Sequence, residues 1–267
     1  SVELARVPAQ PEAPVKPLAV VSPKGGVGKT TLAANLADAF ARAGHTPVAV
    51  VDLDPQNGLA WHFDSGLASE PGLLEAATAD AWIGPGYALE NDAIIVFPFG
   101  QTTEAMRLEL ESWLSQAPNW LGDQLHRHFP APHGIAVLDT PPYHSVHLEQ
   151  ALACADHVLV VLTPDVAAGA TVSDIEAMLE RLQERRPEVV THYLLNRVEP
   201  DPALGDALAA RLRARFGPRL LELSVRRDEA VAEALAFQQP VSRYAPDADA
   251  SQDIDALARR LELHLAP

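Results

Sequence analysis

The chain has 267 residues, enough to bury a large core in one α/β domain or in two small ones. Its 20 basic and 36 acidic residues give a formal net charge of −16, which disfavours nucleic acid and anionic lipid as partners. One cysteine and the lack of any run of about 18 uncharged apolar residues predict a cytoplasmic protein that does not insert directly into a membrane.

The order of apolar runs along the chain predicts the fold. Residues 1–17 contain four prolines and no apolar periodicity, and we interpret them as a flexible leader before a single domain spanning 18–267. Six β-branched or aliphatic runs predict strands, most of them buried on both faces: 18–22, 47–52, 93–97, 134–139, 157–163 and 189–196. Eight segments predict helices: 30–44, 101–116, 119–128, 146–154, 170–186, 203–215, 227–237 and 248–265. This alternation predicts an α/β fold with a doubly wound, mostly parallel sheet.

A glycine-rich segment, SPKGGVGKTT at 22–31, joins the first predicted strand to the first helix. Its glycines let backbone N–H groups turn toward one anion, and the helix N-terminus adds partial positive charge. Lys29 would contact the β- and γ-phosphate oxygens of a nucleotide, and the Thr30 hydroxyl would bind Mg²⁺. The expected nucleotide-binding residues here are Lys24, Gly25, Gly26, Val27, Gly28, Lys29, Thr30 and Thr31. The alternative is a glycine-rich turn with no ligand.

Pro23 stands where the usual P-loop begins with glycine. With this departure, KGGVGKT resembles the deviant Walker A motif of the MinD/ParA family, in the SIMIBI class of P-loop NTPases. The resemblance implies that Lys24 is the family's signature lysine, which reaches across a dimer interface to the partner's nucleotide. A compact, flexible ammonium suits that role better than a planar guanidinium. The alternative is a solvated loop lysine.

Carboxylates follow two of the predicted strands. Asp52 and Asp54 lie two residues apart, on the same side of an extended backbone, at the sheet edge where open α/β folds bind ligands. The family resemblance implies that Asp52 lies near the Mg²⁺ shell and that Asp54 positions the attacking water. VLDTPP at 137–142 is similar to a Walker B strand and second switch, in which Asp139 would hold a Mg²⁺-bound water. The alternative is that these residues only cap the following helices.

Residues after the sixth predicted strand bear on the choice of base. Asn196 matches the family's adenine-contacting asparagine, and Arg197 beside it is a second candidate nucleotide-binding residue. The sequence Asn-Arg-Val-Glu at 196–199 lacks the lysine and the aspartate of guanine-reading motifs, so we expect ATP as the cofactor, with Mg²⁺. The alternative is that Asn196 simply ends the strand.

Two stretches narrow the resemblance. FPFGQ at 97–101 and RRDEAVAEALAFQQPVSRY at 226–244 are similar to the accessory ATPases of bacterial cellulose-synthase operons. The alternative is that many members of the MinD/ParA family share a tail like the second stretch. The MinD/ParA resemblance implies an ATP-dependent homodimer that hydrolyses ATP slowly, and the narrower likeness concerns the partners. It implies cellulose synthase accessory subunits at the inner membrane as partners, which could recruit the protein to that membrane or to a cell pole.

Two other functions remain open. Arginines recur at helical spacing and continue after that helix, as on a surface that binds duplex DNA in partition ATPases; the alternative is a solvated face. They are Arg211, Arg215, Arg219, Arg226 and Arg227. A third possibility is a scaffold in which ATP is structural. The amphipathic segment 253–265 carries acidic residues that offset its arginines, so we expect it to pack on the domain or to dock a partner.

Overall fold

The computed structural model describes residues 3–4, 15–73, 86–89, 93–129, 134–167, 171–199 and 202–265. Its strands form one nine-stranded sheet in the order β1-β4-β5-β3-β6-β2-β7-β8-β9. The strands are β1 (Glu3–Leu4), β2 (Lys16–Val21), β3 (Val48–Asp52), β4 (Tyr87–Leu89), β5 (Ile94–Phe97), β6 (Ile135–Asp139), β7 (His157–Leu162), β8 (Val190–Val198) and β9 (Leu220–Arg226). Pairing is parallel from β5 through β9, and β4 pairs antiparallel with both β1 and β5.

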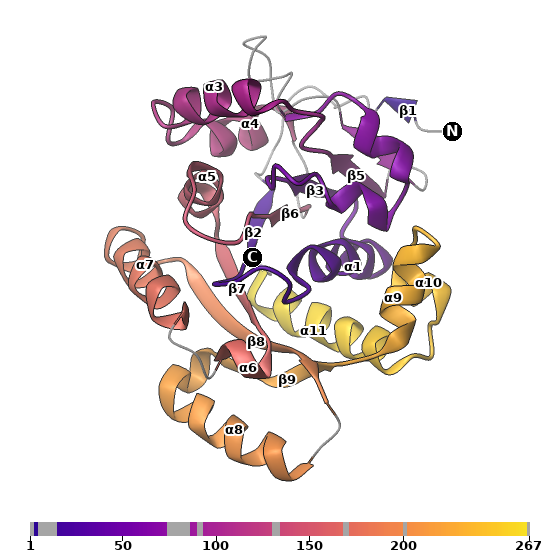
Figure 1. Cartoon of the computed structure of the whole chain (residues 1–267), viewed down its shortest axis with the longest axis vertical. Helices are drawn as coiled ribbons and strands as arrows, with labels where there is room; N and C mark the ends of the chain where they lie inside the picture. Colours follow the sequence, from indigo (N-terminus) through magenta and orange to yellow (C-terminus); the bar gives the residue numbers. More distant parts are fainter. Residues whose placement is uncertain are drawn as a thin grey trace.

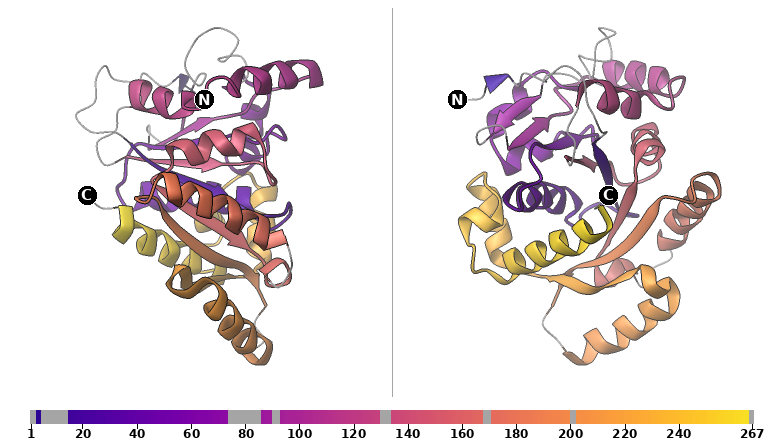
Figure 2. Two further views of the ribbon diagram at one scale, coloured as in Figure 1. Left: turned by 90° about the vertical axis from the view of Figure 1, so that its left-hand side faces the viewer. Right: turned by 180° about the vertical axis from the view of Figure 1, so that it is seen from behind.

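Helices cover both faces of this sheet (Figures 1 and 2). The α-helices are α1 (Lys29–Arg42), α3 (Glu104–Leu114), α4 (Trp120–His128), α5 (Val146–Cys154), α6 (Pro164–Ala167), α7 (Thr171–Arg185), α8 (Pro202–Phe216), α9 (Glu229–Ala236), α10 (Val241–Tyr244) and α11 (Asp249–Leu265). Three 3₁₀ helices are η1 (Leu59–His62), η2 (Ser65–Ser69) and η3 (Gly217–Arg219). Helices α1 and α11 lie on one face, and α5 and α7 lie on the other (Figure 1). No helix of the described residues is long and apolar enough to span a bilayer.

The topology places one loop at the middle of the sheet edge. β2 lies between β6 and β7, and its residues Leu18–Val21 are completely buried because helices cover both faces. The chain passes from β2 through α1 to β3 on one side of the sheet, whereas β7, β8 and β9 follow one another on the other side. The loop after β2 therefore lies at the point where the strand order reverses, the usual ligand position of doubly wound sheets.

The predicted α/β fold with a mostly parallel sheet is confirmed. All six predicted strands are present with ends shifted by at most two residues, and all eight predicted helices are present within three residues. We did not predict β1, β4 and β9. β1 and β4 are only two and three residues long, and β9 has polar residues among its apolar ones, as expected for a strand at the edge of a sheet.

The expected flexible leader, residues 1–17, needs a correction at its end. Lys16 and Pro17 already belong to β2, where they pair with Ile135 and Ala136 of β6, and Val15 is buried. Prolines favour irregular structure in a sequence, but a proline is tolerated at the beginning of a strand, as Pro17 is here. Residues 3–4 form β1, and residues 1–2 and 5–14 lie outside the described part of the chain.

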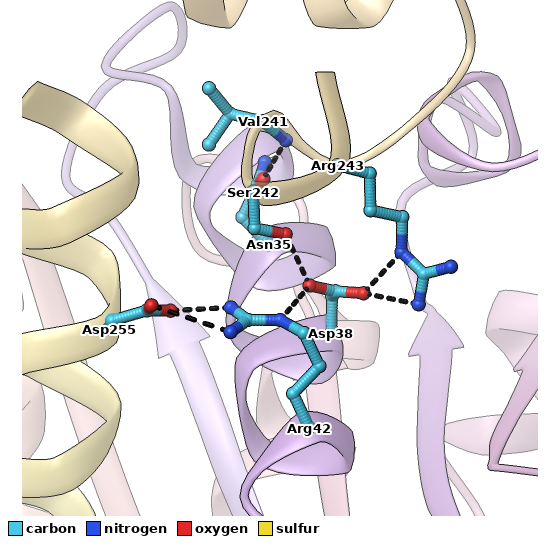
Figure 3. A network of polar contacts seen from close by, with 7 residues as sticks. All are labelled: Asn35, Asp38, Arg42, Val241, Ser242, Arg243 and Asp255. Carbon is cyan, nitrogen blue, oxygen red and sulfur yellow. Dashed lines mark hydrogen bonds and ion pairs between the residues drawn. The ribbon is translucent and has the colours of Figure 1, made fainter. Parts of the chain in front are cut away.

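A buried carboxylate ties α1 to the C-terminal helices (Figure 3). Asp38 is completely buried in α1 and accepts hydrogen bonds from Arg42 Nε at 2.8 Å and from Arg243 Nε at 2.7 Å. The Ser242 hydroxyl donates to the same carboxylate, and Arg42 continues to Asp255 of α11. Because a buried carboxylate must be paired, this network fixes α10 and α11 against α1.

We expect Asp38→Asn to lower the free energy of unfolding by about 2–3 kcal/mol, because two guanidinium groups lose their shared buried partner. Urea denaturation followed by circular dichroism measures this change. The matched control is Asp255→Asn, which removes a partly exposed partner of the same Arg42 and should cost less than about 1 kcal/mol. Equal losses in the two variants would contradict the role assigned to burial.

Candidate nucleotide-binding site

The loop between β2 and α1 has the backbone conformation of an anion cradle. Gly26 and Gly28 have φ angles of +81° and +86°, a region that favours glycine because a Cβ would be strained there. The Ser22 hydroxyl donates to the Lys24 carbonyl at 3.0 Å, and the Gly28 carbonyl accepts the first helical hydrogen bond, from Leu32 N–H. The loop therefore leads directly into the positive end of α1.

Lys29 and Asp139 form a buried ion pair at the centre of the site. The Lys29 Nζ–Asp139 Oδ1 distance is 2.5 Å, and the side chains are 5% and 0% exposed. Asp139 Oδ2 is also buried and has no hydrogen-bond partner among the described residues. An orphaned, buried carboxylate oxygen beside a phosphate loop fits a hydrated metal ion, so these residues suit Mg²⁺.

Asp52 lies directly beside Asp139, because the two residues are register partners in β3 and β6. Its two carboxylate oxygens accept hydrogen bonds from Asp54 N–H and Leu59 N–H, each at 3.0 Å. Burial raises the pKa of Asp52 well above its usual range, and the charge of Asp139 adds to the shift. Asp52 thus holds the loop after β3 in place, and its part in the Mg²⁺ shell stays a prediction.

The loop after β3, which carries Asp54, lies against the start of α1, which carries Thr30. A Cβ on Gly58 of that loop would lie 3.8 Å from Thr30 Cγ2, so the loop packs against the first turn of α1. Asp54 Oδ1 accepts a hydrogen bond from Gln56 N–H at 3.0 Å. Burial raises the pKa of Asp54, while the charge of Lys29 acts in the opposite direction. The candidate water-positioning carboxylate therefore lies at the same edge as the phosphate loop.

Asn196 and Arg197 reach the phosphate loop from the end of β8. Asn196 Nδ2 donates to the Val27 carbonyl at 2.8 Å, and Arg197 Nη1 donates to the Gly26 carbonyl at 2.7 Å. The sequence led us to expect contacts with adenine at these positions. The structure adds direct bonds to the loop itself, and the adenine contact remains a prediction.

A pocket of about 790 Å³ opens beside the phosphate loop, on the side of β7, β8 and α9. Its wall includes Lys24, the loop glycines and Thr31. It also contains residues that the sequence did not single out as site residues: Thr163, Pro164, Asp165, Val166, Val225, Asp228, Glu229, Val231, Ala232, Leu235 and Ile254. The first four follow β7 at the carboxyl edge, a position that could have marked them as candidates.

Two further residues near the site carried no sequence signal. His62 of η1 is buried, and burial lowers its pKa to about 4, although the charge of Asp139 acts in the opposite direction. Tyr143 is exposed with a φ of +84°, an unusual backbone for an aromatic residue. Its hydroxyl lies 4.0 Å from the position a Cβ on Gly25 would take. The loop after β6 therefore lies against the phosphate loop.

Comparison with known proteins identifies the family. The family model "Cellulose biosynthesis protein BcsQ" matches residues 15–261. The chain belongs to the BcsQ family. The BcsQ protein of Salmonella typhimurium is 27% identical over 243 residues, covering 90% of this chain and 92% of the relative. The chromosome partitioning protein ParA of Caulobacter vibrioides is 28% identical over 257 residues, covering 93% and 94%.

Solved structures share the fold of this BcsQ-family chain. Septum site-determining protein MinD from Pyrococcus horikoshii, complexed with Mg-ADP, superposes with a TM-score of 0.73 at 17% identity, covering 94% of this chain and 98% of that one. Cobyrinic acid a,c-diamide synthase from Mycobacterium smegmatis, with bound ATP analog and magnesium, gives 0.76 at 19% identity, covering 94% and 96%. Together with the sequence relatives, these findings show that the chain is a MinD/ParA-type P-loop ATPase.

We expect Gly28→Ala to weaken nucleotide binding strongly in this BcsQ-family chain. A Cβ there would lie 2.7 Å from Asn196 Nδ2 and would also be strained by the φ of +86°. Gly26→Ala is the matched control, since its φ is +81° but no heavy atom lies within 4 Å of the added Cβ, so only backbone strain of about 1–2 kcal/mol applies. Titration with a fluorescent ATP analogue should show a far weaker Gly28→Ala variant; equal affinities would contradict the close approach.

Proposed function

We propose that this chain binds ATP with Mg²⁺, hydrolyses it slowly, and uses the cycle to assemble or localise the bacterial cellulose synthase machinery. The observation that carries the proposal is the match of the cellulose biosynthesis family model over 15–261 to a chain whose phosphate loop retains Lys29. An intact loop lysine supports hydrolysis, because this ammonium neutralises the charge that develops on the phosphate oxygens.

Each residue at the sheet edge would have a separate role in ATP hydrolysis. Mg²⁺ would be held by the Thr30 hydroxyl and, through water, by Asp139, and it would supply charge neutralisation between the β- and γ-phosphates. Lys29 would leave Asp139 for the phosphate oxygens, and the loop amides would share their charge. Asp54 would orient the water that attacks the γ-phosphate in line.

Lys24 suits a role between two copies of the chain. It is exposed at the rim of the phosphate loop, whereas Lys29 is buried. An exposed, flexible ammonium can reach a phosphate in a facing molecule. We therefore propose a homodimer that forms only with ATP, in which the γ-phosphate holds the two copies together until hydrolysis releases them.

Partition on DNA is the second candidate function, favoured by the ParA relative. Contacts of the candidate DNA-binding arginines argue against it. Arg215 pairs with Glu176 at 2.6 Å, Arg226 with Asp253 at 2.9 Å, and Arg227 with Glu199 at 2.7 Å. These ion pairs lower the positive charge that the surface offers to phosphates, although no salt bridge is found for Arg211 and Arg219 among the described residues. Partition therefore stays as the alternative function, which the pull-down described below tests.

Lys24→Ala should leave ATP binding intact and remove the ATP-dependent dimer. Light scattering coupled to size exclusion, with ATP, ADP or no nucleotide, measures the dimer, and calorimetry measures binding. Lys24→Arg is the control: it keeps the positive charge but replaces the ammonium by a planar group, so dimers should form only weakly. A normal ATP-dependent dimer in Lys24→Ala would show that Lys24 does not act across the interface.

Asp54→Ala should stop hydrolysis and trap the ATP-bound dimer, because the attacking water loses its orienting carboxylate. Phosphate release and light scattering measure these two effects. Wild-type turnover in the variant would rule out the water-positioning role.

The trapped Asp54→Ala dimer also tests the biological output through a pull-down from lysate. Recovery of cellulose synthase subunits supports the proposed function. Recovery of DNA that is lost steeply as salt rises supports partition instead. If nucleotide co-purifies with the wild-type protein and does not exchange, and the dimer forms under every condition, the protein is a scaffold with structural ATP.

A further inference from the structure

Two consecutive side chains at the end of β8 donate hydrogen bonds to the phosphate loop. Neighbouring residues of a regular strand point to opposite faces, so Asn196 and Arg197 would not normally reach the same loop. Here Arg197 has a φ of +57°, and the pairing of β8 with β9 shifts register between Asn196 and Val198. This irregularity turns both side chains onto one target, the carbonyls of Gly26 and Val27.

A hydrogen bond to a backbone carbonyl also fixes the direction of the N–H group in the same peptide unit. The peptide bond is planar and trans, so its C=O and N–H point in opposite directions. The peptide whose carbonyl belongs to Gly26 carries the N–H of Val27, and the next peptide carries the N–H of Gly28. No acceptor for either N–H is found among the described residues. The bonds from β8 therefore turn two unpaired donors away from β8, as an anion site requires.

We propose that Asn196 and Arg197 are positioning residues of the ATPase reaction, which set the phosphate-loop amides of Val27 and Gly28 toward the phosphate chain. Their action on the phosphate chain does not depend on the base. The bond to Val27 uses only Asn196 Nδ2 and so does not exclude the adenine contact expected from the sequence. This inference rests on the proposed function, since it assumes that nucleotide phosphates occupy the loop.

The two residues contribute unequally. Asn196 is buried, and its amide nitrogen lies 2.7 Å from the position that a Cβ on Gly28 would take. Arg197 is exposed, and water can replace its hydrogen bond to Gly26. Loss of a buried hydrogen bond is felt more strongly than loss of an exposed one. Asn196 is therefore the main support and Arg197 the secondary one.

The test uses inorganic triphosphate, a probe without a base, beside ATP and GTP, each with Mg²⁺ in isothermal titration calorimetry. Asn196→Ala should weaken binding of inorganic triphosphate roughly tenfold, and binding of ATP and GTP by at least the same factor. A base reader would behave differently: ATP binding would fall while triphosphate binding stayed at the wild-type level. That result, or unchanged affinity for all three, would overturn the proposal.

Arg197 variants keep the test decisive if Asn196→Ala fails to fold in a thermal denaturation control. Arg197→Ala lies at an exposed position and should weaken all three probes by about threefold, while Arg197→Lys, which can still donate to Gly26, should restore most of the loss. Loss of ATP binding with unchanged triphosphate binding would again overturn the positioning role. Wild-type protein that binds neither ATP nor triphosphate would overturn the proposed function itself, and this inference with it.

Discussion

The buried ion pair between Lys29 and Asp139 is the constraint on which the site depends. A lysine and an aspartate that are both withdrawn from water require each other, because either charge alone would be strongly destabilising. Asp52 is the register partner of Asp139, and burial together with the charge of Asp139 raises the pKa of Asp52. An arriving phosphate would replace Asp139 as the partner of Lys29. Asp139 thus balances the charge of Lys29 within the chain, as the phosphate of a nucleotide would do in its place.

The elements that carry Lys29 and Asp139 are each fixed by further hydrogen bonds and ion pairs. Lys29 begins α1, and the same helix is fastened two turns later to α10 and α11 through Asp38 (Figure 3). Asp139 ends β6, and the Thr140 hydroxyl that follows donates to the Val20 carbonyl of β2 at 2.8 Å. The phosphate loop between them is supported from β8. A site on rigid elements keeps its geometry without a ligand, which reduces the entropy lost on binding.

The sequence predicted this arrangement where the information is local. Glycines in SPKGGVGKTT require unusual φ angles, and aliphatic runs require burial, so the loop, the parallel sheet and the carboxylates at its edge could all be derived. The role of Asn196 could not, because it depends on a register shift between β8 and β9, and we had not predicted β9. The sequence also could not predict that residues of α9 line the pocket, since their position follows from tertiary packing.

The ion pairs of the arginines also depend on tertiary structure. They give a reason why the chain uses arginine more often than lysine. Arg42 and Arg243 pair with Asp38, Arg226 pairs with two aspartates of α11, and Arg215 joins α8 to α7. A planar guanidinium suits such fixed, multiply bonded contacts between secondary-structure elements. The phosphate loop instead carries two ammonium groups, which can exchange partners because each is a compact charge on a flexible stem. The preference for arginine elsewhere thus separates the cations that fix the fold from those that respond to a nucleotide.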